Sequence, residues 1–148
     1  MRSACAVAGW IQIIVRDAIT GLVLVHHREP NTIVNTGLDL IAERLRGNTG
    51  EAGLSHYAIG TDNTPPVAGD AALHAEAYRD LITQTRVSGG QLIVTLELGA
   101  TQGNGLTFQE GGAFTPQNIM LCRGIYPAVS KTSAKILTVI HTIPFTAL

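Results

Sequence analysis

A histidine and a glutamate one residue apart, His74 and Glu76, form the pattern in this chain that is most easily linked to a reaction. The same His-x-Glu spacing occurs in zinc deaminases, but those enzymes also need a Pro-Cys-x-x-Cys segment, which the chain lacks. A three-residue match without its structural context is weak evidence, so we interpret this segment as an exposed helical turn. The pair His26-His27 is an equally poor metal site, because adjacent residues of a strand point to opposite faces.

Oxygen-bearing side chains gather in the segment "TDNTPPVAGD", where Asp62, Asn63 and Asp70 resemble scattered calcium ligands. The alternating acidic positions of an EF-hand loop and its closing bidentate glutamate are missing. Asx turns and helix capping explain these residues more simply, and an ion site is the alternative. The glycine-rich residues 99–105 have no following Gly-Lys-Ser/Thr, so we expect a β-turn loop rather than a phosphate-binding loop.

Nucleophilic catalysis would need a serine or cysteine beside a base, and no local motif of that kind surrounds Cys122 or any serine. Two cysteines, Cys5 and Cys122, are too few for a disulfide framework or a zinc site, so we expect two small buried or half-buried thiols. His141 lies in an apolar segment and is expected in a core or an interface. A triad built from distant residues stays open, but the sequence predicts no catalytic residue, no metal and no cofactor, and thus a protein that is not an enzyme and binds no small molecule.

The composition indicates a single globular domain with unusually little charge. The 148 residues fit one domain, with 45% hydrophobic and only 14% charged residues. A formal net charge of −1 gives no basic excess for nucleic acid. No apolar run approaches the ~20 residues that span a bilayer, and no signal peptide is recognisable, so we expect synthesis in the cytoplasm.

The elements that must position these residues are mostly strands. Residues 9–28 are typical of a hairpin, and Gly89-Gly90 predicts a tight turn between residues 79–88 and 91–98. One convincing helix covers about residues 37–46, with Thr36 as its N-cap and Gly47 as its stop, and a further helical turn is expected from Asp70. Further strands are expected at residues 55–60, 106–114, 119–127 and 135–145. About seven strands at this spacing predict a mainly β fold, a single antiparallel β-sandwich domain over residues 1–148 with the helix packed on it. Residues 1–30 would form an N-terminal β-hairpin that docks on a neighbour.

Several segments from about Asn31 onward resemble a family of small virion proteins of tailed bacteriophages. They are "NTIVNTGLDLIAERLRG", "SHYAIGTDNTPPVAGDAALHAEAYR", "LTFQEGGAF" and "VSKTSAKILTVIHTIPF". Asp62 stands where glycine is common in that family, and Gly112-Ala113 replaces its usual Gly-Leu. The resemblance implies a non-enzymatic component of a tail, tail fibre or baseplate, located in the virion. A capsid decoration or head-fibre protein, a receptor- or glycan-binding module, and a small enzyme are the alternatives.

The last predicted strand has no clearly polar face, because Ile136 and Ile140 alternate with an equally apolar set on its other side. A strand that is apolar on both faces must be covered on both. The sequence therefore predicts a homo-oligomer, for which a trimer is one option, or contacts with other virion proteins. We assign Trp10, Ile136, Ile140 and Phe145 to this interface, with a core position for Trp10 as the alternative.

Overall fold

A computed structural model of the chain describes residues 9–50 and 52–145. Within these residues it contains one helix and nine strands. In chain order they are β1 (Gly9–Asp17), β2 (Val23–Ile33), α1 (Asn35–Leu45), β3 (His56–Gly60), β4 (Glu76–Leu81), β5 (Gln84–Ser88), β6 (Gln91–Leu98), β7 (Thr107–Phe114), β8 (Met120–Ser130) and β9 (Lys135–Pro144). No helix in this part of the chain is long and apolar enough to cross a lipid bilayer.

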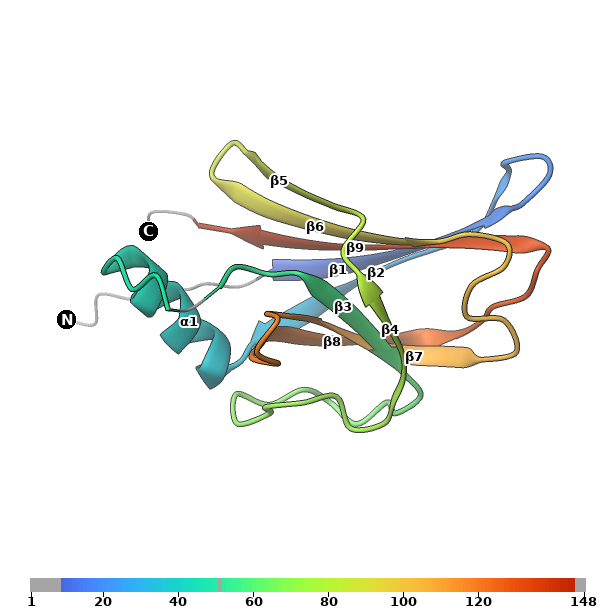
Figure 1. Cartoon of the computed structure of the whole chain (residues 1–148). Helices are drawn as coiled ribbons and strands as arrows, with labels where there is room; N and C mark the ends of the chain where they lie inside the picture. Colours follow the sequence, from blue (N-terminus) through green and yellow to red (C-terminus); the bar gives the residue numbers. More distant parts are fainter. Residues whose placement is uncertain (1–8, 51, 146–148) are drawn as a thin grey trace.

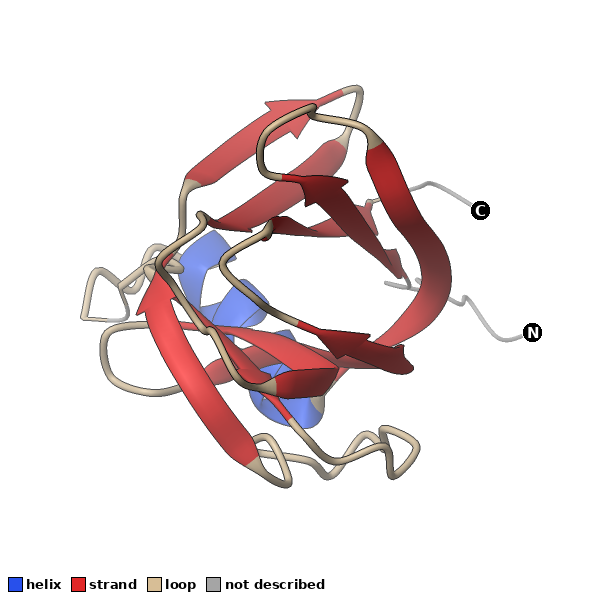
Figure 2. Cartoon of the chain, turned by 90° about the vertical axis from the view of Figure 1, so that its right-hand side faces the viewer, coloured by secondary structure: helices blue, strands red, loops and turns tan. Residues whose placement is uncertain are grey.

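The nine strands form one antiparallel sheet in the order β4-β3-β7-β8-β2-β1-β9-β6-β5, and the sheet curls into a half-barrel with α1 beyond one end (Figures 1 and 2). The two edge strands, β4 and β5, are joined by Ile82 and Thr83 alone. The Ile82 N–H donates to the Ser55 carbonyl, and the Thr83 N–H donates to the Thr95 carbonyl of β6. The chain therefore passes from one edge of the sheet to the other within two residues.

The predictions of a mainly β antiparallel fold, one helix and an N-terminal hairpin are confirmed. Two separate sheets, as a sandwich requires, are not seen. The reason lies in β2, which pairs with β1 along most of its length and with β8 at residues 31–33. This short pairing joins the two halves into one sheet.

The N-terminal hairpin is built into the middle of the sheet. Strand β1 pairs with β2 on one side and, from Trp10 to Asp17, with β9 on the other. The predicted turn is present: Asp17 Oδ1 accepts from the N–H groups of Ile19 and Thr20, at 2.9 and 2.7 Å, and Gly21 has a φ of 73°. Only the tip extends away from the body (Figure 1). A docking role for the hairpin stays a prediction, and residues 1–8 lie outside the described part.

Helix α1 begins two residues earlier than predicted, directly after β2. Val34 is its N-cap, whereas the predicted cap, Thr36, lies inside the first turn and donates its hydroxyl to the Met120 carbonyl at 2.8 Å. The start of the helix lies close to β8, since a Cβ at Gly37 would overlap the carbonyl oxygen of Leu121. Only glycine permits this approach. Gly47 follows the helix with a φ of 87°, which confirms the predicted stop.

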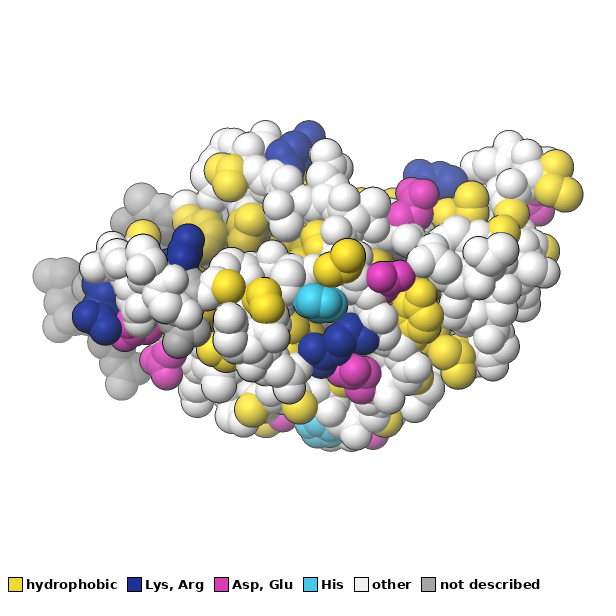
Figure 3. All heavy atoms as spheres, in the orientation of Figure 1, with side chains coloured by type: hydrophobic (Ala, Val, Ile, Leu, Met, Phe, Trp, Pro, Cys, Tyr) yellow, Lys and Arg dark blue, Asp and Glu magenta, His cyan; other side chains and the backbone are white. Residues whose placement is uncertain are grey.

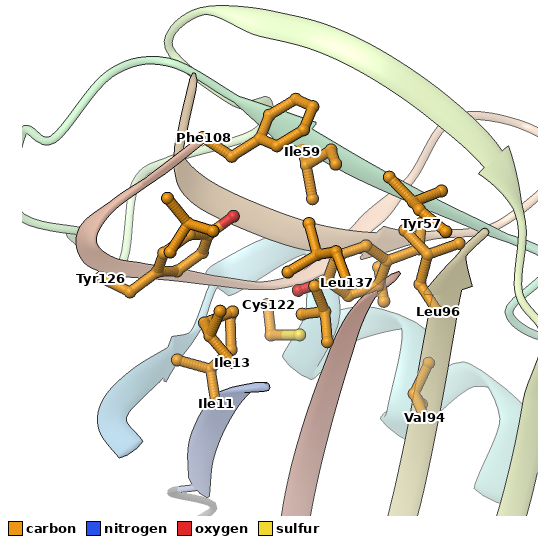
Figure 4. Close-up of a cluster of buried hydrophobic side chains, with 14 of the residues drawn as sticks. Ile11, Ile13, Tyr57, Ile59, Val94, Leu96, Phe108, Cys122, Tyr126 and Leu137 are labelled. Carbon is orange, nitrogen blue, oxygen red and sulfur yellow. The ribbon is translucent and has the colours of Figure 1, made fainter. Parts of the chain in front are cut away.

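The concave face of the sheet holds the main hydrophobic core, to which β1, β3 and β6–β9 all contribute (Figure 4). Of the two apolar sets in the last predicted strand, the one that contains Leu137, Val139, His141 and Ile143 is fully buried there. A second, smaller cluster lies on the other face of β3 and β7, next to residues 61–75. Its members are Val34, Ala58, Leu73, Phe114 and Met120.

Candidate functional site

A buried arginine, Arg123 of β8, is the centre of the most extensive polar network in the described residues. Its side chain is fully buried, and its Nε donates to Glu110 Oε2 at 2.8 Å. Its Nη1 donates to the Thr64 carbonyl at 2.9 Å and approaches Asp70 Oδ2 at 3.3 Å, and its Nη2 lies 3.5 Å from Asp62 Oδ1. One guanidinium therefore ties strand β7, the start of the loop of residues 61–75 and Asp70 within that loop to β8.

Glu110 completes the attachment of this loop. Its two carboxylate oxygens accept from the backbone N–H groups of His74 and Ala75, at 3.1 and 2.7 Å. A Cβ at Gly60 would overlap both the Ala75 carbonyl and the Glu110 carboxylate, so the loop can lie this close only because residue 60 is glycine. Sequence reasoning missed Arg123 and Glu110. The signal in the sequence was that each of these two strands carries a single charged residue and that the two charges are opposite.

Two of the three candidate calcium ligands, Asp62 and Asp70, belong to the same network. Asp62 Oδ1 accepts from the Thr64 N–H at 2.8 Å, so a predicted Asx turn is present at Asp62. Asp70 Oδ2 accepts from the Val67 N–H, three residues earlier in the chain, at 3.1 Å. Hydrogen bonds from Thr64 lower the pKa of Asp62. Partial burial alone would raise the pKa of Asp70, but the hydrogen bonds from His74 and Val67 and the charge of Arg123 bring it below its ordinary value.

The His-x-Glu pattern does not form a catalytic pair. The helical turn expected from Asp70 is absent, because residues 70–75 are irregular backbone with bends. His74 faces Asp62 and Asp70, at 3.4 and 3.1 Å, while Glu76 binds Arg79 at 2.7 Å. Within residues 9–50 and 52–145, no three His, Cys, Asp or Glu side chains come together in a way that could hold a metal ion.

A cysteine and a histidine from distant parts of the chain do meet in the core. Cys122 Sγ lies 3.4 Å from His141 Nδ1, and the imidazole lies 5.3 Å from the Tyr57 ring. Burial raises the pKa of Cys122 to about 12 and lowers the pKa of His141 to about 3. Both groups are therefore neutral at pH 7, whereas a nucleophilic cysteine needs a thiolate. The adjacent His26 and His27 point to opposite faces, as predicted, and His26 contacts Gln12 at 3.2 Å.

Three of the four predicted interface residues share one surface, the outer face of β1 and β9. Trp10 pairs with Thr142, Gln12 with Ile140, and Arg16 with Ile136, so all three apolar residues point away from the core. Each is only half-buried. The Arg28 guanidinium lies 4.2 Å from the centre of the Trp10 ring. The fourth residue, Phe145, does not belong to this face: it follows the inward series of β9.

Two open grooves, each of about 390 Å³, flank these residues. The first, which we name the outer groove, crosses the outer face of β1, β9, β6 and β5. It is lined by Gln12, Gln84, Arg86, Ile93, Thr95, Ile140 and Thr142. The second, the helix groove, lies beside α1 and includes Phe145. Its other lining residues are Leu40, Ile41, Arg44, Leu45, Gly53, Leu54, Leu92 and Leu121.

Comparisons with protein-family models, with curated proteins and with solved structures found no match for this chain.

Proposed function

We propose that the chain is a non-enzymatic structural subunit of a bacteriophage virion, a component of a tail, tail fibre or baseplate. Its partners are other copies of itself and neighbouring virion proteins, and a trimer is one option for the oligomer. The resemblance of residues 31–145 to small phage virion proteins is the source of this proposal. The observation that carries it in the structure is the apolar outer face of β1 and β9.

This face supports an assembly role because it presents large apolar side chains on a regular, rigid surface. Trp10, Ile136 and Ile140 lie there, together with Ile14 of β1 and Ile93 of β6, and all are half-buried. These apolar side chains alternate with polar ones such as Gln12, Thr138 and Thr142. Protein interfaces are mixed in the same way, and a tryptophan often dominates the binding energy of an interface. The face lies opposite the core, so a partner could cover it without rearranging the fold.

The polar chemistry supports the same role. The buried charges of Arg123 and Glu110 bind each other and the loop of residues 61–75, and the buried Cys122–His141 pair is neutral. These groups hold the protein together. Their arrangement favours a stable building block over a reaction centre.

Replacing Ile140 with lysine should weaken self-association by about tenfold or more, because burial of one isoleucine side chain contributes roughly 1.5–3 kcal/mol. Sedimentation equilibrium over a range of protein concentrations measures this change. The control is Val67→Lys, which replaces an exposed aliphatic residue by lysine in the loop of residues 61–75, away from this face. A wild-type protein that stays monomeric at micromolar concentration would contradict the assembly role.

Mass spectrometry of purified particles encoded by the same genome tests the virion assignment itself.

A capsid decoration or head-fibre protein would use the same kind of face, and electron cryomicroscopy of the intact particle distinguishes it from a tail component.

A second candidate, a glycan-binding module, is favoured by the outer groove. Its amide, hydroxyl and guanidinium groups from Gln12, Gln84, Arg86 and Thr95 can bind sugar hydroxyls. Retention on host-cell glycans that is lost in Arg86→Ala would support this candidate.

A further inference from the structure

The helix groove continues the hydrophobic core past the end of the sheet. Phe145 follows the buried Ile143 by two residues, and Leu92 of β6 pairs with Ile143, so both groove residues lie on the core side of the sheet. On the other wall of the groove, Leu45 of α1 is 83% exposed. Figure 3 shows hydrophobic side chains gathered beside α1, between the helix and the sheet. An exposed apolar surface of this kind marks a site of contact.

Strand β1 begins at the end of the sheet that lies next to α1 (Figure 1). Its first residue, Gly9, pairs with Asn31 of β2. Gly9 also lies so close to β9 that a Cβ there would overlap the carbonyl oxygen of Thr142. The strand is therefore fixed between both neighbours up to Gly9, and its backbone at that residue is directed toward α1.

The registers of β1 with its two neighbours show where the residues before Gly9 fall if the strand continues. Trp10 lies opposite Thr142 of β9, so position 7 falls opposite Phe145. Gly9 lies opposite Asn31 of β2, so position 7 also falls opposite Ile33, the last residue before the N-cap of α1. Both registers thus lead the chain into the helix groove at position 7.

The residue types before Gly9 match this placement. The buried residues Ile11 and Ile13 point to the core, and side chains of a strand alternate between its faces, so positions 5 and 7 fall on the core side. Those positions hold Cys5 and Val7, while the opposite face would carry only the alanines Ala4, Ala6 and Ala8. The larger apolar side chains of the segment therefore face the groove.

The length of the segment also fits. From Gly9 to Cys5 an extended chain covers about 13 Å. Helix α1, which has 11 residues, is about 16 Å long. Cys5 therefore falls beside the helix and does not pass its far end.

We propose that residues 4–8 extend β1 into the helix groove of the same chain, with Val7 and Cys5 against its apolar lining. The registers of β1 select this occupant, and the alternation of side chains selects which face it turns to the groove. The contact lies within one chain, so it goes beyond the proposed function and does not depend on it. It also gives Cys5 the buried or half-buried position that the sequence predicts.

Disulfide trapping through the natural Cys5 tests this placement. Two full-length variants, Ile41→Cys and Leu45→Cys, put a second cysteine in the groove one helical turn apart. A disulfide needs Cα atoms within about 7 Å of each other. Under oxidation with diamide, at least one variant should link to Cys5 within a single chain about tenfold faster than the control, because the groove holds both thiols at a high effective concentration. Mass spectrometry of unreduced peptides measures the rates.

The control for trapping is Ile19→Cys, which replaces an exposed aliphatic residue in the turn at the opposite end of the sheet (Figure 1). Cys122 does not compete in these reactions, because burial raises its pKa to about 12 and the thiolate is the reactive form.

Anilinonaphthalene sulfonate, a dye that binds exposed apolar surface, gives an independent readout. Removal of residues 2–8 should uncover the groove and raise the dye fluorescence several-fold above that of the wild type. Val7→Asp should act in the same direction, whereas Ala6→Asp, the matched control on the opposite face, should keep the wild-type signal. An unchanged near-ultraviolet circular dichroism spectrum verifies that each variant keeps its native packing.

Equal trapping rates in the groove variants and in Ile19→Cys would overturn the proposal, as would a wild-type protein that binds the dye as strongly as the truncated one. Disulfides that form only between two chains would identify the segment of a second copy as the occupant. Dye binding that rises only when residues 146–148 are removed would identify those residues instead, and either result would contradict the proposal. Trapping within one chain, together with virions that lack the protein, would disprove the virion role alone.

Discussion

Replacement of Arg123 with methionine is expected to lower the free energy of unfolding by about 3–5 kcal/mol, because removing one partner of a buried ion pair leaves the other charge uncompensated. Glu110, which is fully buried, would keep only the two backbone N–H donors of His74 and Ala75. The loop of residues 61–75 would also lose the hydrogen bond between Arg123 and the Thr64 carbonyl. Urea denaturation followed by circular dichroism measures the change.

The matched control for this substitution is Arg86→Met, which removes an exposed arginine of β5 and should change stability by no more than about 0.5 kcal/mol. Hydrogen exchange gives a local readout, since the amides of His74 and Ala75 donate directly to Glu110 and should exchange faster in Arg123→Met. A loss below about 1 kcal/mol with unchanged exchange at these two amides would show that the network does not hold the loop.

Local features of the fold were predictable because short-range chemistry determines them. Gly89 and Gly90 adopt φ values of 57° and 73° in the predicted hairpin between β5 and β6. The alternation along β9 predicted that Leu137 and Val139 lie on the opposite face of the strand from Ile136, and the structure has this arrangement. In both cases the residue type itself, a glycine or an apolar side chain at every second position, carries the information.

Features that depend on distant parts of the chain were not predictable in this way. Residues 79–88 look like one continuous strand, yet they divide at Ile82 because the first half pairs with β3 and the second with β6. The same segment therefore supplies both edges of one sheet, which the expected sandwich did not include. Thr36 is a good N-cap by its type, but the nearby Met120 carbonyl accepts its hydroxyl, and the helix starts at Asn35 instead.

In the candidate site, too, contacts between near neighbours were predictable and contacts between distant residues were not. The Asx turn at Asp62 involves a neighbour two residues away, and it was predicted. The meeting of Asp62 and Asp70 with Arg123 spans more than 50 residues and depends on the register of β7 against β8. A single charge in an apolar strand indicates that a partner exists. It does not say which residue the partner is.

The stability of the protein should fall steeply between pH 6.5 and pH 4.5, and His141 should cause most of the loss. Burial lowers its pKa in the folded protein to about 3, from an ordinary value of 6.5. Below pH 6.5 the histidine becomes protonated in the unfolded chain, whereas in the folded protein it stays neutral down to about pH 3. The free energy of unfolding therefore has its full value above pH 6.5 and decreases as the pH falls through this window. The slope is about 1.4 kcal/mol per pH unit, which gives a loss of roughly 3 kcal/mol by pH 4.5.

His141→Leu should remove most of this slope, because leucine fills the buried position without a titrating group. The carboxylates Asp62 and Asp70 do not interfere: their pKa values lie below 3.8, so their contribution is present throughout the window and is lost only at lower pH. Urea denaturation at pH 7.5, 6.0 and 4.5 measures the slope for each variant. His26→Gln, which removes an exposed histidine from the outer face, is the control and should keep the wild-type slope. If His141→Leu and the wild type lost stability in parallel, the buried imidazole could not be the group that causes the acid sensitivity.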